Sequence, residues 1–374
     1  MGLGAGGTAG ALLGVELAGT DAAAGLPLGL LVLGSAASAL LISGRSNRVG
    51  RARSLALGYA LGSAGAALSV FAAAAGSLAA LLAGSLLLGS ANASVFLARY
   101  AAAEAAGEAS TGRALGVVLF STSVGAIASP LLLDPSGDLV HAAGLPRLSG
   151  IYLIAAVAFL AAGATLGLGG VGLVHRPEET FTPTRRQLLD GAFAVPARYG
   201  VALLASANFV MVGVMAVAPV YLMAHGEDLE MVGTAISLHV AGMFAPSPLS
   251  GWLVDRVGPR AVVGAGCVFM LVAGLGGALA DPQGVWWTPL VLVTLGIGWN
   301  FGVVGGSAFI AGSMDASLQT YVEGIGEAAM GAAAAVAAPM AGLVVALGGF
   351  AALSFAMAVV VMLAAACLTA PLRS

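Results

Sequence analysis

Twelve long apolar runs, separated by short polar segments, constrain the fold of this chain more than any other feature of its sequence. A helix needs roughly 20 apolar residues to cross the roughly 30 Å hydrocarbon layer of a bilayer. With 59% hydrophobic and only 8% charged residues, the chain is predicted to be an all-α integral membrane protein. The predicted spans lie near residues 2–18, 25–43, 54–75, 77–98, 114–133, 149–173, 199–223, 232–253, 261–280, 286–311, 322–346 and 349–370.

The positions of the arginines predict how the chain is oriented. All fourteen basic residues are arginine. Twelve spans put both termini on one side, and if that side is the cytoplasm only Arg147 lies outside. Cytoplasmic loops of membrane proteins carry an excess of basic residues. We therefore expect a multi-pass protein of the inner or cytoplasmic membrane, with both termini in the cytoplasm.

A short polar loop occurs twice between apolar runs. The first copy, residues 43–51, reads SGRSNRVGR, and the second, residues 251–260, reads GWLVDRVGPR. Each copy combines Asn or Asp, arginines and a glycine in a connection too short to cross a bilayer. Asn47 and Asp255 occupy equivalent places and differ by 208 in residue number. The repeat predicts that the chain consists of two related halves.

The offset of 208 extends beyond the loops, because it also carries Asn92 onto Asn300 without a gap. The longest polar segment separates the halves and is expected either to be a flexible linker or to hold a short amphipathic helix. The predicted organisation is an N-terminal six-helix bundle over 1–174, a cytoplasmic linker over 175–198 and a C-terminal six-helix bundle over 199–374. Applied to the seventh span, the offset points upstream of the first residue, so we expect the first span to be truncated.

The two loops resemble the signature loop of the major facilitator superfamily, which lies between helices two and three and again between helices eight and nine. The resemblance implies two pseudo-symmetric bundles of six helices that rock about a substrate site at the membrane midplane. The first copy departs from the pattern, with Ser43 in place of the leading glycine and Asn47 in place of Asp. The second copy departs only at Pro259.

The repeated loops predict a latch. Asp or Asn would face a helix N-terminus, and arginines would pair with neighbouring acids, so that both contacts break when the halves move apart. The alternative is that the arginines only fix the topology, with Arg99 marking the inner interface and Glu323 stabilised by a helix dipole. The candidate latch residues are Asn47, Arg48, Gly50, Arg51, Asp255, Arg256, Gly258, Arg260, Arg99 and Glu323.

In the fifth span, Gly125, Ser129 and Pro130 resemble the GxxxGP element that proton-coupled exporters of the superfamily carry there. Small residues allow helices to approach closely and proline bends a helix. Ser129 replaces the second glycine of the element. A similar segment around Pro339 in the eleventh span favours the alternative that proline kinks serve the rocking motion in general.

Titratable residues inside a membrane are costly and indicate function. His239 lies inside the eighth span and is expected either to carry the coupling proton or to be a neutral ring bonded to an adjacent helix. Glu327 shares a face with Glu323 at the cytoplasmic start of the eleventh span. It is expected either to protonate during transport or to stabilise the helix start through the dipole.

Three asparagines are candidate substrate contacts. Asn92 and Asn300 would face the central cavity, where an amide can both donate and accept hydrogen bonds. The alternative is that they join neighbouring helices. Asn208, in the seventh span, belongs to the same set.

No motif points to an enzyme, since the sequence has no phosphate-binding GxxxxGK[ST] and no cysteine or histidine cluster with metal spacing. We expect no cofactor, no metal and no nucleic-acid partner, and a monomer in the lipid bilayer. The predicted function is proton-coupled export of small organic molecules by alternating access, with protons or another ion as the coupling partner. The alternatives are import of a polar nutrient such as a vitamin, sugar or nucleoside, or a truncated paralogue that does not transport.

Overall fold

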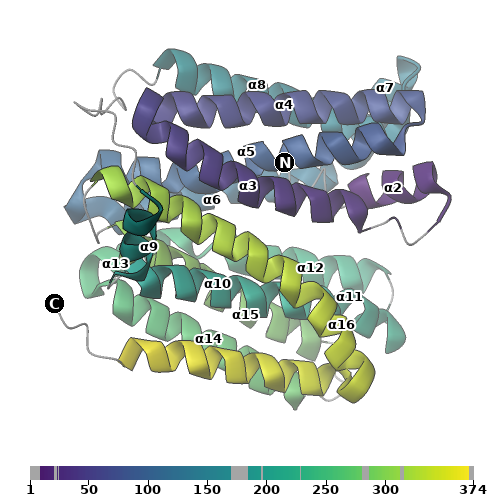
Figure 1. Ribbon diagram of the computed structural model, residues 1–374. Coiled ribbons are helices and arrows are strands. Elements are labelled where there is room, and N and C mark those ends of the chain that lie inside the picture. Colours follow the sequence, from purple (N-terminus) through teal and green to yellow (C-terminus); the bar gives the residue numbers. More distant parts are fainter. Residues whose placement is uncertain are drawn as a thin grey trace. The chain divides into compact units, whose positions relative to one another are not determined.

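The computed structural model describes residues 9–20, 23, 25–169, 184–194, 197–227, 229–279, 286–311 and 316–369. Over these residues the secondary structure is helical and no strand occurs (Figure 1). The helices are α2 (Gly10–Ala18), α3 (Leu26–Val49), α4 (Arg51–Ala75), α5 (Leu78–Ala106), α6 (Thr111–Leu131), α7 (Leu133–Ala142), α8 (Gly150–Gly169), α9 (Arg185–Phe193), α10 (Ala197–Met215), α11 (Ala218–Ala224), α12 (Leu229–Phe244), α13 (Ser247–Val257), α14 (Pro259–Ala278), α15 (Trp287–Ala311) and α16 (Ala316–Thr369), with two short 3-10 helices, η3 (Glu108–Ser110) and η4 (Arg147–Ser149).

The chain forms two compact units. The first consists of Met1–Ala101 and Val124–Pro183, and the second of Ala102–Ser123 and Thr184–Ser374. The first part of α6 therefore packs with the second unit, although it precedes the linker in sequence. The bundle boundaries expected from the sequence stay a prediction.

Eight helical segments of the described chain are long and apolar enough to cross a membrane. Several predicted spans take a form that their length did not reveal. The span 199–223 is divided into α10 and α11. The span 232–253 is divided into α12 and α13 by a break at Ala245 and Pro246. Helix α16 has 54 residues, about 80 Å at helical rise, and Gly349 inside it is non-helical, with φ 73° and ψ −177°. The chain reverses there, so that α16 contains the last two predicted spans (Figure 1).

The two repeated loops have the same backbone conformation. Gly50 joins α3 to α4 with φ 91° and ψ 152°, and Gly258 joins α13 to α14 with φ 84° and ψ 159°. The two glycines differ by 208 in residue number, as Asn47 and Asp255 do. A positive φ of this kind is readily adopted only by glycine. The sequence repeat is thus also a repeat of local structure.

Small residues let the helices of the first unit approach closely. A Cβ on Gly62 of α4 would overlap the side chain of Ala91 of α5, and one on Gly34 of α3 would overlap Leu86 of α5. Contacts between small residues replace the hydrophobic effect as the source of helix association in lipid. Tyr59 and Phe159 stack with ring centroids 6.1 Å apart in the core between α4 and α8.

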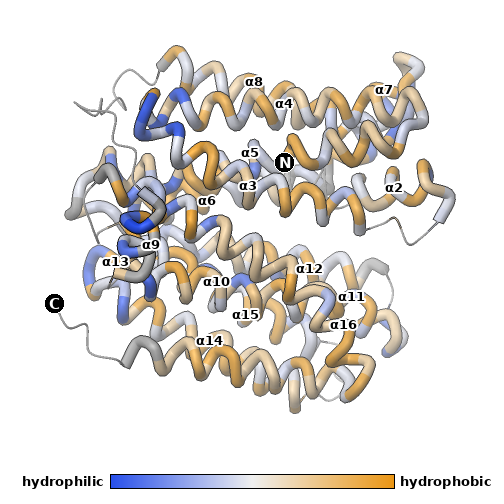
Figure 2. The backbone as a smooth tube through the Cα atoms, viewed as in Figure 1, coloured by the Kyte–Doolittle hydropathy of each residue, from blue (hydrophilic) through white to orange (hydrophobic). Residues whose placement is uncertain are grey.

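Polar residues of the second unit gather at one end. Figure 2 shows hydrophilic colouring around α9 and α13. Within the linker, α9 begins at a capping box, in which Thr184 accepts from the N–H of Gln187 and the Gln187 side chain accepts from Thr184 N–H. Its Gly191 lies against Leu318 of α16. This part of the linker is therefore a helix that packs against α16. Residues 175–183 of the linker lie outside the described residues.

Candidate functional site

The N-terminus of α6 presents backbone N–H groups that have no partner within the helix. The helix begins at Thr111, after the turn at Gly107, whose φ is 74°, and the short helix η3. The Thr111 hydroxyl donates to Gly107 O at 3.2 Å. The first N–H groups of a helix have no partner within it, and the helix dipole gives this end a partial positive charge. The start of α6 is therefore suited to bind an anion.

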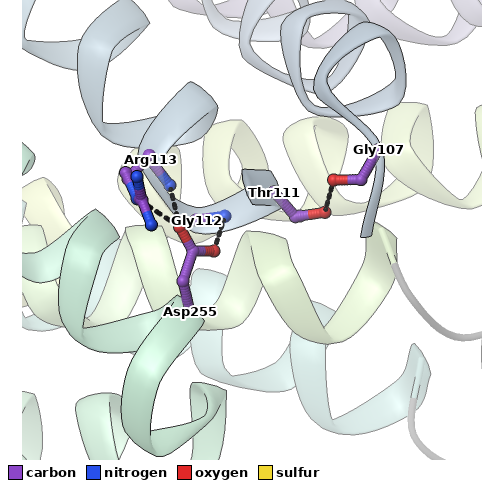
Figure 3. A network of polar contacts seen from close by, with 5 residues as sticks. All are labelled: Gly107, Thr111, Gly112, Arg113 and Asp255. Carbon is purple, nitrogen blue, oxygen red and sulfur yellow. Dashed lines mark hydrogen bonds and ion pairs between the residues drawn. The ribbon is translucent and has the colours of Figure 1, made fainter. Parts of the chain in front are cut away.

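Asp255 of α13 supplies that anion. Its Oδ1 accepts from Gly112 N–H at 2.6 Å and its Oδ2 accepts from Arg113 N–H at 3.1 Å. The Arg113 Nε lies 3.3 Å from Oδ2, and the Asp255 side chain is 6% exposed against 60% for Arg113. Figure 3 shows the carboxylate of Asp255 pointing at the first turn of α6. Asp255 thus caps a helix that begins 144 residues earlier in the chain.

The capping contact depends on glycines where α6 crosses α13. A Cβ on Gly112 would overlap Gly251 O, and a Cβ on Gly251 would overlap Gly112 O. A Cβ on Gly116 would likewise overlap Ser247 O. The two backbones are in direct contact here, which brings the Asp255 side chain within hydrogen-bonding distance of α6. We call the three glycines and Ser247 the α6–α13 crossing.

The other predicted latch residues differ in their exposure. Asn47 and Gly50 are buried, Gly258 and Arg51 are half-buried, and Arg48 and Arg260 are exposed. Arg256 is exposed and its guanidinium lies 5.1 Å from the ring centroid of Trp252. Asp255 is the member of the predicted set whose carboxylate accepts from backbone N–H groups at a helix start. Gly112 and Arg113, which complete the site, were not among the predicted site residues.

Arg99 is buried within the protein. Its side chain is fully buried, donates to Phe96 O at 2.8 Å and lies over the rings of Phe96 and Tyr100. Glu323 and Glu327 on α16 are also buried, and Glu323 accepts from Gln319 Nε2 at 2.9 Å. Buried charges of this kind in a membrane protein indicate function.

His239 is buried at the contact between α12 and α15. Its side chain is 1% exposed, and Nδ1 lies 2.6 Å from Leu292 O. Because a carbonyl only accepts, Nδ1 is assigned the proton. Within the described chain, Nε2 has no hydrogen-bond partner. The ring is thus held by one backbone bond and keeps one buried nitrogen available.

The three asparagines lie in different surroundings. Asn208 is half-buried, donates to Met330 O at 2.8 Å and accepts from Trp299 Nε1 at 3.1 Å. Asn92 is half-buried and donates to Ser35 Oγ at 2.9 Å. Asn300 is fully buried, and its amide is engaged by residues on both sides of the break between α12 and α13.

The predicted kink element lies along α6. Ser129 is buried and Gly125 is half-buried, while Pro130 is the penultimate residue of the helix. Pro130 therefore lies at the end of α6, whereas Pro339 lies inside α16. A proline this close to the end of a helix has little helix beyond it to bend.

A sequence model of the family described as Major Facilitator Superfamily matches residues 1–317 and also residues 201–373. YddS of Bacillus subtilis, an uncharacterized MFS-type transporter, is 34% identical over 377 residues, which cover 97% of this chain and 85% of that protein. The riboflavin transporter RfnT of Brucella anthropi is 30% identical, with 80% of this chain and 74% of that protein covered. The crystal structure of the human organic anion transporter MFSD10 has a TM-score of 0.74 at 17% identity, with 96% of this chain and 88% of that chain covered.

Proposed function

The chain belongs to the Major Facilitator Superfamily, and from this premise we propose that it is a secondary active transporter that exports small organic molecules in exchange for protons. The observation that carries the proposal is the capping of α6 by Asp255. A contact made by one carboxylate with a helix end can form and break without refolding either helix. Alternating access requires such a reversible contact. We place the transporter in the inner or cytoplasmic membrane, with both termini in the cytoplasm.

The strength of the Asp255 contact suits a two-state switch. Losing a capping side chain costs about 0.5–2 kcal/mol, and the exposed pair with Arg113 adds less than about 1 kcal/mol. Moving a two-state equilibrium from 1:99 to 99:1 takes about 5.5 kcal/mol. Asp255 can therefore supply a substantial part of this free energy while leaving the latched state reversible. Asn47, at the equivalent place in the first loop, would contribute a weaker, uncharged contact.

For proton coupling, we propose His239 as the carrier. Its Nε2 is the atom that would gain a proton, while Nδ1 keeps its bond to Leu292 O. Imidazole is among the few side chains that can both accept and release a proton under physiological conditions. Glu327 is the alternative carrier. Asn208 and Asn92 are proposed to contact the substrate through the hydrogen-bonding capacity that their bonds to neighbouring helices leave.

Import of a polar nutrient is the second candidate, and the relative RfnT favours it. A flavin presents a flat ring system with donors and acceptors at its edge. The Asn208 amide beside the Trp299 indole offers matching groups. We therefore include riboflavin, which is fluorescent, among the first substrates to test.

Purified protein in liposomes with imposed pH gradients of both signs tests direction and coupling. Export coupled to protons predicts that a test compound accumulates only in liposomes with an acidic lumen. Uptake of riboflavin under the opposite gradient would contradict export and favour import. The variant His239→Gln should abolish accumulation driven by the gradient yet retain exchange of substrate down its own gradient. The control is His225→Gln, since His225 is exposed and bonded to Tyr221 O. Undiminished accumulation by His239→Gln would make the histidine structural and move the carrier to Glu327.

A further inference from the structure

The eighth span is broken just before the helix that carries Asp255. Pro246 and Pro248 lack backbone N–H groups, so neither can donate to the carbonyl four residues earlier. Leu249 and Ser250 both donate to Pro246 O at 2.9 Å, which starts α13 as a new helix. A break of this kind leaves carbonyls at the end of α12 in need of donors.

Asn300 of α15 bonds to both sides of this break. Its Nδ2 donates to Met243 O, at the end of α12, at 2.7 Å and to Ser247 Oγ, at the start of α13, at 2.6 Å. Its Oδ1 accepts from Ser250 Oγ at 2.6 Å. Asn300, Ser247 and Ser250 are fully buried, and Met243 is nearly fully buried. The amide therefore has both N–H groups and its oxygen engaged, and it joins α12 to α13 through a third helix.

The direction of α13 decides whether Asp255 reaches α6. Asp255 lies eight residues beyond Ser247, about 12 Å along the helix. At that distance a tilt of about 10° at the break would move the carboxylate by about 2 Å. Hydrogen bonds of 2.6 Å and 3.1 Å to Gly112 and Arg113 do not survive such a displacement.

We propose that Asn300 is a positioning residue for the Asp255 latch, acting by fixing the angle between α12 and α13. The proposal rests on the proposed function, in which capping of α6 is the reversible contact of transport. It assigns Asn300 a role different from substrate contact, because its amide is fully buried, both N–H donors are used and the oxygen already accepts from Ser250. It also explains why Ser247 and Ser250 are buried hydroxyls in an apolar span.

The first half of the chain provides an internal control. Asn92 is the residue equivalent to Asn300, but within the described chain its amide donates to Ser35 Oγ of α3, and α3 runs unbroken from Leu26 to Val49. Replacing Asn92 removes a half-buried amide that bonds to an unbroken helix. A variant there reports the general effect of losing an asparagine from this protein.

A cysteine at Thr111 serves as the reporter, since it lies beside the latch in the first turn of α6 (Figure 3). Thr111 is half-buried when the latch is formed. In a background carrying Cys267→Ala and Cys367→Ala, the increase that a further variant causes in the rate at which a water-soluble maleimide labels Thr111→Cys therefore reports opening of the latch. Asn300→Ala and Asp255→Ala should each raise this rate about tenfold, the usual effect of losing a helix cap. If Asn300 acts through Asp255, the double variant should label no faster than Asp255→Ala alone. Asn92→Ala should label at the background rate.

Independent effects, giving about a hundredfold rise in the double variant, would overturn the proposal, as would an unchanged rate in Asn300→Ala. If Asn300→Ala does not fold, Ser250→Ala takes its place, because it removes only the donor to Asn300 Oδ1. It is compared with Asp255→Ala and with the double variant in the same way. Labelling requires no transport. If a variant is labelled faster but transports as well as the wild type, the latch is not needed for transport. Asn300 would still be the residue that positions Asp255.

Discussion

The two repeated loops share a backbone and differ in what their side chains do. Gly50 and Gly258 have nearly the same φ and ψ, and each ends one helix and begins the next. The second loop carries Asp255, whose carboxylate caps α6, whereas the first carries the uncharged Asn47. The turn is thus common to both halves, and the charged cap belongs to the second.

The difference extends to the residue that leads each loop. Gly251 packs its backbone against Gly112, with no room for a Cβ. At the equivalent place in the first loop stands Ser43, which is buried and whose Oγ lacks a hydrogen-bond partner within the described chain. Glycine is therefore required only where the second loop makes its close crossing. A repeated connection can keep its geometry while one copy alone acquires a tight contact.

The largest effect is expected from giving the second loop the residue of the first. Gly251→Ser places a Cβ on backbone atoms of α6 that cannot move aside, and overpacking costs about 1–3 kcal/mol or more. Transport should fall by up to about a hundredfold, and Thr111→Cys should be labelled correspondingly faster. The matched control is Gly264→Ser in α14, where a Cβ meets nothing within 4 Å. Equal transport in the two variants would show that the crossing tolerates side chains.

A smaller effect is expected from making the cap resemble Asn47. Asp255→Ala removes two hydrogen bonds and an ion pair and should slow transport about tenfold. Asp255→Asn keeps one acceptor oxygen and should slow it about threefold. Initial rates of substrate exchange in liposomes measure both. The control is Asp138→Ala, since the Asp138 pair with Arg147 is exposed. An Asp255→Asn variant as slow as Asp255→Ala would mean that the charge alone matters.

The smallest effect concerns salt. Asp255 binds uncharged N–H groups as well as the exposed Arg113 side chain, and only the latter contact is readily screened. Raising ionic strength from about 0.1 M to about 1 M should speed labelling of Thr111→Cys by no more than about threefold. Arg113→Ala should remove most of that dependence. A dependence that persists in Arg113→Ala would place another charged group in the latch.

The fold could be predicted from the sequence because the bilayer imposes a length on apolar runs and the repeat imposes an offset. Both are local or periodic signals, and the helices begin and end near the predicted places. The break in the span 232–253 was missed, although Pro246 and Pro248 carry the signal for it. An apolar run with two prolines near its middle predicts a broken helix as readily as a continuous one.

The site was predicted in part. Asp255 was identified from its loop, and its facing a helix N-terminus was expected from the resemblance. Its particular partners, Gly112 and Arg113, are distant in sequence and follow only from tertiary structure. The role of Asn300 could not be predicted either, because an amide in a membrane can line a cavity or join helices. Only its burial and its three hydrogen bonds separate these roles.

The α6–α13 crossing has a consequence for the thermodynamics of opening. Ordering a side chain costs rotamer entropy, up to about 2 kcal/mol for a long residue, whereas glycine has none to lose. Where Gly112, Gly116 and Gly251 meet, the backbones come together without restricting any rotamer. The free energy of the contact should then be set by a few hydrogen bonds and van der Waals contacts, with little side-chain entropy to recover on separation. A contact of this kind can form and part once in every transport cycle with a small barrier in either direction.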